Sequence, residues 1–338
     1  MLTDKKKSFI KANLIVSGIL VLIAAVFFIS ILVYRSKFPH EYAAKRFSAG
    51  KRFAQITVFV PESANFTVDN VMYFRYKLEK KLTENSIETS EGKRNYFDAY
   101  SSERDSNIAT DNKNSPSKVI YIGGDYSKFH TEFENMPDIT KDLNHDRVLL
   151  SRSAAWKLYG GSSLYDFPVK IDGDSYLVSA VFNDYTGQTY EEYYENAPPV
   201  VADIQRVPDT PITCYEIVLV NPVNEFAKNR VKECLDFDES TYVLVENSSR
   251  FGFVNLYKKI PTLLNYNENV PVGVLLPPYE IAARKAEKIL TFLVLLFTIF
   301  IAYPALWVVI YIIKGIRFVK RLFDKFIIDK IKDKLSYS

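Results

Sequence analysis

The sequence predicts an α+β domain carried between two transmembrane helices. Two apolar runs without a charged residue, 14–34 and 289–313, contain 21 and 25 residues. At a rise of about 1.5 Å per residue they reach roughly 31 and 37 Å, enough to cross a hydrocarbon core of about 30 Å. Between them, short β-rich runs alternate with amphipathic helical segments, which indicates a mixed α/β domain over residues 35–288.

The first apolar run has two interpretations. It follows a basic start with Lys5, Lys6, Lys7 and Lys11, as a cleaved signal peptide would. Its apolar stretch is longer than the usual 7 to 15 residues of such peptides, and no A-x-A cleavage site follows it. We therefore interpret residues 14–34 as an uncleaved anchor.

Charge is distributed unevenly along the chain and bears on orientation. The net charge is +3, yet residues 53–283 carry 22 Lys and Arg against 34 Asp and Glu, whereas the tail after the second span carries eight basic residues and three Asp. A basic tail beside a membrane helix favours the cytoplasmic face. The connector 35–52 is also basic and favours the opposite orientation. Because long domains translocate largely regardless of charge, we expect residues 1–13 and 314–338 in the cytoplasm and residues 35–288 outside it.

The first half of the domain has a β-α-β-β pattern. Residues 54–60 predict a strand, and residues 68–85 predict a helix capped by Thr67 or Asp69. Residues 96–101 and 119–122 predict two short strands. The polar stretch between these strands, residues 102–117, is rich in turn formers and predicts a mobile loop.

The middle of the domain has the most ordered pattern. Residues 147–150 predict a strand, and residues 151–159 predict a helix with Ser151 as N-cap and Gly160-Gly161 as its stop. Residues 167–171 and 176–182 predict the two strands of a hairpin around Asp172-Gly173.

The last part of the domain alternates strands and helices. The predicted strands cover 200–204, 213–221 and 241–245, and the predicted helices cover 222–233 and 250–264. The apolar run 270–276 ends at Pro277-Pro278, before the second span, in which Pro304 is expected to introduce a kink. Cys214 and Cys234 lie where an antiparallel strand and helix bring their ends together, so they are either two buried thiols or a disulfide.

Three segments carry a family pattern. The run DRVLLSRSAAWKLYGGSSLYDFPVKIDGDSYLVSAVF, residues 146–182, contains a strand, a short helix ending in Leu-Tyr-Gly, and a hairpin. AQITVFV at 54–60 leads into an amphipathic helix, and IGGDYSKFH occupies 122–130. Together they resemble the MacB-like periplasmic core of MacB/FtsX-type ABC transporter permeases, over roughly 35–313. The resemblance implies a MacB-core-like fold of two subdomains, with the hairpin-containing one at about 126–212.

The chain also departs from that family pattern. Asp166-Phe167 stand where a glycine commonly precedes the first hairpin strand, and Ala180 stands where the V-x-G-V glycine is expected. Typical members have four membrane helices, of which three follow the domain, but only one follows it here. The resemblance therefore implies a two-helix variant that lacks the last permease helices and pairs with a more complete subunit.

Motifs for catalysis and metal binding are missing from the sequence. It contains neither G-x-x-x-x-G-K-[ST] nor G-x-S-x-G, so ATP hydrolysis and serine hydrolase chemistry are not expected. His40, His130 and His145 form no H-x-x-x-H or H-E-x-x-H pair, and a metal site would need ligands from distant segments. His145 beside Asp142 and Asp146 is a minor metal candidate against a solvated loop. We predict no catalytic, cofactor-binding or metal-ligating residue, no cofactor, and no enzymatic activity.

Two further segments are candidates for binding. Residues 190–195, Tyr-Glu-Glu-Tyr-Tyr-Glu, combine rings and carboxylates that suit a cationic ligand, although an exposed loop or short helix is the plainer interpretation. Residues 315–335 form a basic amphipathic helix with apolar positions at helical spacing. That helix is expected to lie on the cytoplasmic leaflet or to dock a partner ATPase, and its apolar positions are Ile316, Val319, Phe323, Phe326, Ile327 and Ile331.

These observations lead to two functional hypotheses. The first is a non-ATPase membrane subunit of a MacB/FtsX-like ABC transporter system, whose outer domain binds a substrate or partner and couples conformation across the membrane. Its expected partners are the lipid bilayer, a separate ABC ATPase or full-length permease, and further copies in a homo- or hetero-oligomer, with no nucleic acid. The alternative is a membrane-anchored extracytoplasmic receptor or interaction module unrelated to transport.

Overall fold

Two compact units make up the chain. The computed structural model describes residues 4–47, 52–85, 95–263 and 270–336. One unit holds the β-sheet and contains Lys37–Asn255 and Asn265–Glu287. The other holds the two long helices and contains Met1–Ser36, Leu256–Leu264 and Lys288–Ser338. The predicted domain limits, 35 and 288, remain predictions, and the sheet unit begins and ends close to them.

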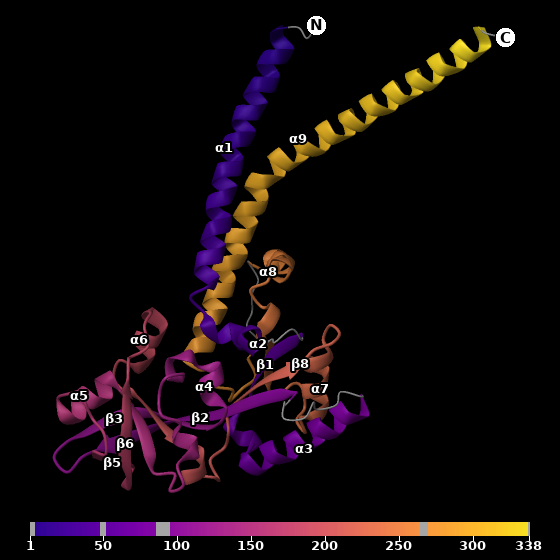
Figure 1. The fold of residues 1–338 in the computed structure, drawn as a ribbon. Helices are drawn as coiled ribbons and strands as arrows, with labels where there is room; N and C mark the ends of the chain where they lie inside the picture. Colours follow the sequence, from indigo (N-terminus) through magenta and orange to yellow (C-terminus); the bar gives the residue numbers. More distant parts are fainter. Residues whose placement is uncertain (1–3, 48–51, 86–94, 264–269, 337–338) are drawn as a thin grey trace. The chain divides into compact units, whose positions relative to one another are not determined.

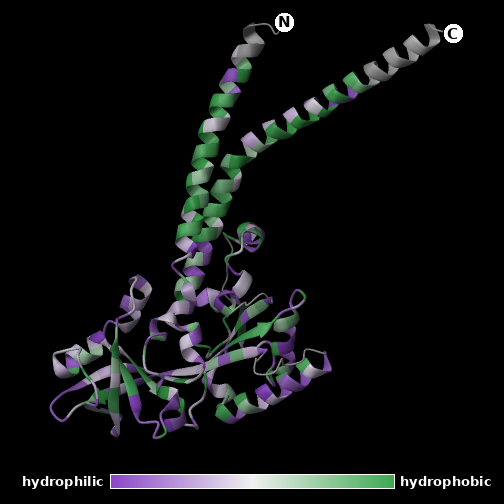
Figure 2. Cartoon of the chain, in the orientation of Figure 1, coloured by the Kyte–Doolittle hydropathy of each residue, from purple (hydrophilic) through white to green (hydrophobic). Residues whose placement is uncertain are grey.

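Two helices are long and apolar enough to cross a membrane. They are α1 (Asp4–Arg35) and α9 (Pro278–Ser336). Only 11% of the most apolar window of each helix is buried within the molecule, and Figure 2 shows hydrophobic residues along both. A long apolar helix with exposed side chains suits contact with lipid, whereas a core helix of a soluble protein would be covered. These helices fit a two-pass membrane protein.

Aromatic contacts join α1 and α9 within the helical unit. Phe27 stacks on Phe300 at 5.6 Å between ring centroids, and the Tyr303 hydroxyl donates to Asn13 Oδ1 at 2.6 Å. Pro304 lies inside α9, and Figure 1 shows this helix bent where its colour passes from orange to yellow. Proline removes one helical hydrogen bond and crowds the preceding turn, which accounts for a bend in this helix.

The C-terminal segment is helical and continuous with the second span. It is the last part of α9 and not a separate helix. Ile316, Val319 and Phe323 are exposed. An apolar helix face that contacts lipid or a partner protein has such exposed side chains. The remaining predicted face positions, Phe326, Ile327 and Ile331, lie outside the side chains that the structure describes.

The sheet unit is built on one continuous sheet. In the described part of the chain nine strands pair in the order β3-β7-β4-β6-β5-β2-β8-β1-β9. The strands are β1 (Phe53–Phe59), β2 (Tyr96–Ala109), β3 (Asn114–Gly124), β4 (Arg147–Ser151), β5 (Pro168–Ile171), β6 (Asp174–Phe182), β7 (Pro199–Asp203), β8 (Cys214–Val220) and β9 (Val243–Glu246). Most pairs are antiparallel, but β3–β7 and β4–β6 are parallel, so the sheet is mixed.

Strand β2 makes this sheet close on itself. One of its edges pairs with β3 over Ala99–Ala109. Its other edge pairs first with β8, over Tyr96–Ser101, and then with β5 at Ile108 and Ala109. Strands β2, β3, β7, β4, β6 and β5 therefore form a closed circuit, while β8, β1 and β9 extend from it. The predicted subdomain at about 126–212 contributes β4 to β7 to this circuit, and its boundaries remain a prediction.

The predicted mobile loop at 102–117 is wrong. Those residues form most of a long hairpin between β2 and β3, closed by a turn in which Thr110 N–H donates to the Lys113 carbonyl at 2.8 Å. Ser115 and Ser117 are buried, and the Ser117 hydroxyl donates to the Pro198 carbonyl. The strand was missed because its inward side chains are small and polar, and their hydrogen bonds come from a distant segment.

Helices cover both faces of the strands β1, β2 and β8. On one face, α3 (Val68–Glu84) and α7 (Phe226–Cys234) pack against the odd residues of β8, such as Ile217. On the other face, α2 (Ala43–Phe47) and α4 (Tyr126–Phe129) pack against Phe97 and Val218. Figure 1 shows these helices around the strands. Because both faces are covered, a polar side chain on β8 is buried and needs a partner.

Most local elements agree with the sequence prediction, including their caps. Thr67 and Asn70 form a reciprocal capping box at the start of α3. Ser151 accepts from Ala154 N–H at the start of α5 (Arg152–Tyr159), and Gly160 ends that helix in the left-handed region, with φ of 74°. Asp172 and Gly173 both have positive φ in the β5–β6 turn, as a type I′ hairpin requires.

Several boundaries in the last part differ from the prediction. Helix α7 begins at Phe226 and not at residue 222, because Glu225 takes a left-handed conformation with φ of 61°. The predicted helix at 250–264 is shorter and consists of α8 (Phe253–Lys259) followed by a 3-10 turn at Ile260–Thr262. The run 270–276 forms no regular element, although Val274 packs with Phe59 and Cys214.

Candidate functional site

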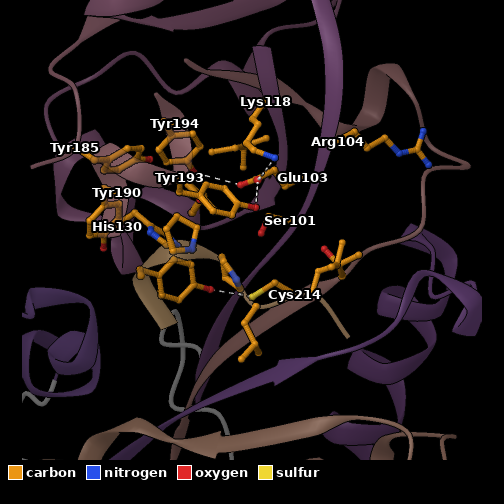
Figure 3. A pocket seen from close by; sticks show the side chains of 18 of the residues that line it. Ser101, Glu103, Arg104, Lys118, His130, Tyr185, Tyr190, Tyr193, Tyr194 and Cys214 are labelled. Atoms are coloured by element: carbon orange, nitrogen blue, oxygen red, sulfur yellow. Dashed lines mark hydrogen bonds and ion pairs between the residues drawn. The ribbon is translucent and has the colours of Figure 1, made fainter. Parts of the chain in front are cut away.

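A small cavity lies inside the sheet unit. It encloses about 90 Å³ between β2, β3, α4, α6 (Gln188–Tyr194), the start of β8 and the first turn of α9. Figure 3 shows its lining side chains. A single water needs only about 10–15 Å³, whereas pockets for larger ligands measure roughly 300–1,000 Å³. The cavity therefore suits a few waters, an ion or one side-chain-sized group.

Four tyrosines form one wall of this cavity. Tyr185 stacks on Tyr190 and Tyr194, with ring centroids 5.3 and 5.6 Å apart, and Tyr193 meets Tyr194 edge-on at 5.0 Å. Tyr190 and Tyr194 are four positions apart on α6 and so share one helix face. Burial raises the pKa of Tyr185 and Tyr194 well above the usual value, which keeps their hydroxyls protonated as hydrogen-bond donors.

The carboxylate that these tyrosines meet is Glu103 of β2. Tyr193 donates to one of its oxygens at 2.6 Å and Tyr194 to the other at 3.2 Å. Burial raises the pKa of Glu103, and this effect exceeds the opposing effects of the two hydroxyls and of Lys118, whose Nζ lies 3.9 Å away. Lys118 Nζ also lies 4.6 Å from the centre of the Tyr193 ring.

The predicted cation site at 190–195 is only partly assembled. Its tyrosines face the cavity, but Glu191 accepts from Gly187 N–H and Glu192 accepts from Gln188, so these carboxylates bond to their own helix. The chain's own Lys118 occupies the position over the Tyr193 ring that an external cation would take. Sequence reasoning missed Glu103 because it had placed this residue in a loop.

A group of histidines and glutamates adjoins the cavity, and we call it the histidine cluster: His40, His130, Glu132 and Glu216. His130 and Glu216 are buried, and His40 and Glu132 are partly buried. His130 Nε2 lies 2.8 Å from Glu216 Oε2, and His130 Nδ1 lies 3.9 Å from Glu132 Oε1. His40 Nε2 lies 3.8 Å from Glu132 Oε2. Four separate segments supply these residues: the 3-10 turn Pro39–Tyr42, the end of α4, the 3-10 turn Thr131–Phe133, and β8.

The two histidine rings differ in their electrostatic surroundings. Burial by itself lowers the pKa of His130, but the charge of Glu216, the hydrogen bond to it and the charge of Glu132 together raise that pKa. Burial also lowers the pKa of His40, and there it outweighs the attraction of Glu132. Tyr126 stacks on His130 at 4.1 Å and fixes the plane of that ring.

Three buried atoms of the histidine cluster lack a hydrogen bond. They are His40 Nδ1, Glu132 Oε1 and Glu216 Oε1, judged against the residues that the structure describes. Buried acceptors without a donor are costly and mark a position for an additional ligand.

A second group, the arginine cluster, consists of Glu41, Arg250, Glu280, Arg284 and Glu287. Arg250 donates twice to Glu280, at 2.7 and 3.0 Å, and its Nη1 lies 3.4 Å from Glu41. Its Nε lies 3.7 Å from Glu287, so each guanidinium nitrogen faces a carboxylate. Arg284 donates to Glu280 at 2.7 Å from the next helical turn. All five residues are at most 9% exposed.

The proton balance of the arginine cluster depends on Glu41. Its three glutamates exceed its two arginines by one negative charge. Burial, followed by repulsion from Glu280 and Glu287, raises the pKa of Glu41 to about 8, although Arg250 opposes this. A protonated Glu41 makes the cluster neutral, which a buried site favours.

The remaining predicted residues are distributed elsewhere. His145 Nδ1 lies 2.7 Å from Asp203 Oδ2 of β7, so its ring partner is neither Asp142 nor Asp146. Cys214 and Cys234 are both free and buried, and the disulfide interpretation is wrong for this structure. Cys214 Sγ lies 3.0 Å from the Tyr279 hydroxyl, while Cys234 packs in the core around α3 and α7.

One sequence signal, which the sequence analysis did not use, could have revealed this site. Glu216 interrupts the otherwise apolar strand sequence Cys-Tyr-Glu-Ile-Val-Leu-Val of β8. A glutamate in a strand buried on both faces needs a partner, so its position indicated a buried polar site. No comparable signal marked His40 or Arg250, which lie in connecting segments.

No family model and no curated protein matches the chain. Among solved structures it is similar to the periplasmic region of MacB from Actinobacillus actinomycetemcomitans, with a TM-score of 0.40 and 12% identity over 58% of this chain and 89% of that one.

Two other solved domains are similar to it. The extracellular domain of the noncanonic ABC-type transporter YknZ from Gram-positive bacteria gives a TM-score of 0.36 and 12% identity, over 56% of this chain and 99% of that one. A domain described as that of a permease protein from Porphyromonas gingivalis gives 0.35 and 15%, over 62% and 92%. All three TM-scores lie below 0.5.

Proposed function

We propose that this protein is a membrane subunit of a MacB/FtsX-like ABC transporter system, without ATPase activity of its own. The observation that carries the proposal is the arginine cluster. It joins Glu41, in the connector that follows α1, to Glu280 and Glu287, in the first turns of α9, through Arg250.

The arginine cluster provides a route for conformational coupling. Glu41 lies six positions after the last residue of α1, and Glu280 lies in the first turn of the helix that continues into the second apolar run. Because all three glutamates bind one guanidinium, a displacement of Arg250 acts on both connectors together. A domain tied in this way to two membrane helices suits a subunit that passes conformation between a bound partner and the membrane.

The sequence supports the transport context. Residues 146–182 resemble the MacB core signature, and the structure builds β4, α5, β5 and β6 from this run. No phosphate-binding loop occurs in the sequence, so the ATPase of such a system is a separate chain. We place residues 1–13 and 314–338 in the cytoplasm and the sheet unit outside it, on the charge of the C-terminal tail.

Co-purification tests this function. The full-length chain, carrying a small affinity tag, is solubilised in detergent from the membranes of its source cell, and the proteins bound to it are identified by mass spectrometry. We expect an ABC ATPase or a complete permease at a stoichiometric level. Recovery of the chain alone, or with lipid only, would contradict the proposal and favour the membrane-anchored receptor.

A truncation gives the matched control. Removal of residues 315–338 leaves both apolar runs and the sheet unit intact but deletes the cytoplasmic part of α9. We expect the truncated chain to reach the membrane and to lose the ATPase. Unchanged partner recovery after truncation would show that the tail does not dock the ATPase.

A further inference from the structure

We propose that His40, His130 and Glu132 form a binding site for one Zn²⁺ ion. One ligand atom from each of these residues lies within 4.8 Å of the other two. Two imidazole nitrogens and one carboxylate oxygen are a ligand set that zinc uses in sites with an open fourth position. The site is independent of the proposed transport role.

The separations are close to those of a bound ion. With Zn–N and Zn–O bonds of about 2.0–2.2 Å, two tetrahedral ligand atoms lie roughly 3.4 Å apart. His40 Nε2 lies 3.8 Å from Glu132 Oε2 and His130 Nδ1 lies 3.9 Å from Glu132 Oε1, so the two histidines face different oxygens of one carboxylate. Binding one ion therefore requires side-chain rotation that brings one ligand atom of each residue together, and the side chains of Glu132 and His40, which are 22% and 14% exposed, have room for it.

Glu216 and Tyr126 prepare His130 for metal binding. The 2.8 Å contact with Glu216 Oε2 places the ring proton on Nε2, and this leaves the Nδ1 lone pair directed toward Glu132. A carboxylate that accepts from the far nitrogen of a metal-binding histidine is a recurrent supporting element of zinc sites. Tyr126 stacks on the ring and restricts its rotation.

A bound cation supplies a partner for one of the three unpaired atoms. Glu132 Oε1 accepts no hydrogen bond from any described residue, although it is buried. Glu132 and Glu216 also bring two carboxylates next to one site. A divalent cation supplies the missing partner of Glu132 and offsets this negative charge.

The chemistry of the ligands selects the metal. Imidazole nitrogen favours zinc and neighbouring transition metals, whereas Mg²⁺ and Ca²⁺ prefer six or more oxygen ligands. His130 and Glu132 line the cavity of about 90 Å³, so the fourth position opens onto a space that holds water or one small group.

The test is a zinc titration of the full-length chain in detergent. The protein is purified with a tag that contains no histidine, stripped with a chelator, and titrated with Zn²⁺ against a chromogenic competitor. We expect one equivalent to bind, and Co²⁺ to give the visible absorption bands of a tetrahedral site. Mg²⁺ and Ca²⁺ are expected not to compete.

Variants locate the site. H40A and E132Q are each expected to lower zinc affinity by at least tenfold, and E216Q by about 10- to 100-fold. Because the chain has only three histidines, H145A is a matched control that retains wild-type affinity, and the exposed Glu134 provides E134Q. Circular dichroism verifies that each variant is folded.

Two results would overturn the proposal. One is a stripped wild-type protein that binds no zinc and gives no Co²⁺ bands, which requires no variant to interpret. The other is wild-type affinity in both H40A and E132Q, or an equal loss in H145A. The partners recovered from membranes are expected to be the same for H40A and wild type, so failure here is distinguishable from failure of the transport proposal.

Discussion

The arginine cluster is buried and the histidine cluster is partly buried, and each contains a residue of the 3-10 turn Pro39–Tyr42. The two clusters differ in how completely their charges are matched. In the arginine cluster each guanidinium nitrogen of Arg250 faces a carboxylate. In the histidine cluster three polar atoms have no hydrogen-bonding partner among the described residues. The arginine cluster has one such atom, Glu41 Oε2, and it belongs to the carboxyl group whose pKa burial raises to about 8. A proton on Glu41 therefore completes the first cluster, whereas the second has three unpaired atoms.

This difference separates a structural role from a binding role. A buried ion group that matches its own charges holds segments together but has little to offer a ligand. A group with unpaired buried acceptors beside a cavity can bind a ligand that supplies the missing partners. Two polar clusters in one domain can therefore be assigned different roles from their hydrogen-bond inventory.

The largest expected effect comes from breaking the arginine cluster. Arg250→Met removes its central cation and leaves Glu41, Glu280 and Glu287 buried without it. We expect a loss of roughly 3–5 kcal/mol in unfolding free energy. Thermal or denaturant unfolding of the detergent-solubilised chain measures it.

The exposed Arg152 provides the control for this variant, because among the described residues its side chain hydrogen-bonds to the Asn183 side-chain oxygen alone. Arg152→Met is expected to change stability by no more than about 0.5 kcal/mol. Equal effects of the two substitutions would show that the arginine cluster does not stabilise the domain.

Zinc is expected to stabilise the protein through the histidine cluster alone. At a free concentration of a hundred times its Kd, a ligand that binds only the folded state adds about 2.7 kcal/mol. Unfolding of wild type and His40→Ala with and without Zn²⁺ measures this increment, which should vanish in the variant. An increment that persists in His40→Ala would place the metal elsewhere.

The pH dependence of stability distinguishes the clusters further. The pKa of Glu41 is raised by burial to about 8 from an ordinary 4.5, so the folded state holds this proton more tightly than the unfolded state. The resulting stability is complete below pH 4.5 and is lost as the pH rises through 8, by up to about 1.4 kcal/mol per pH unit. In metal-free protein, Glu41→Gln should flatten this decline between pH 5 and 8.

The exposed Glu62 supplies the comparison for that pH series. Glu62→Gln is expected to leave the slope of stability against pH as it is in wild type. A wild-type slope that Glu41→Gln does not change would mean that Glu41 is already ionised in the folded domain.

The smallest expected loss of stability comes from a residue outside both clusters, and it serves as a reference for the larger losses. Ser151 caps α5 by accepting from Ala154 N–H at 3.2 Å. Ser151→Ala should cost about 1 kcal/mol, the usual value of one N-cap, when measured by the same unfolding experiment. A cost as large as that of Arg250→Met would remove the contrast between a local cap and the arginine cluster.

Sequence reasoning succeeded wherever the signal was local. The boundaries of α3 and α5 were predicted because Thr67, Ser151 and Gly160 act on residues within four positions of themselves. It failed for residues 102–117, where polar side chains sit in a long hairpin, and for α7, whose start depends on the conformation of Glu225. Those outcomes depend on neighbours that are distant in sequence.

The sequence by itself determined the two apolar helices, the mixed α+β character of the domain and its individual turns. Hydrophobic length, residue periodicity and capping are properties of neighbouring residues. Only the tertiary structure decided the closed circuit of strands and the two polar clusters. His130 meets Glu216 across 86 positions, and Arg250 meets Glu41 across 209. Such pairs form because sheet pairing and two-sided burial bring distant polar groups out of water together, and no local pattern encodes that meeting.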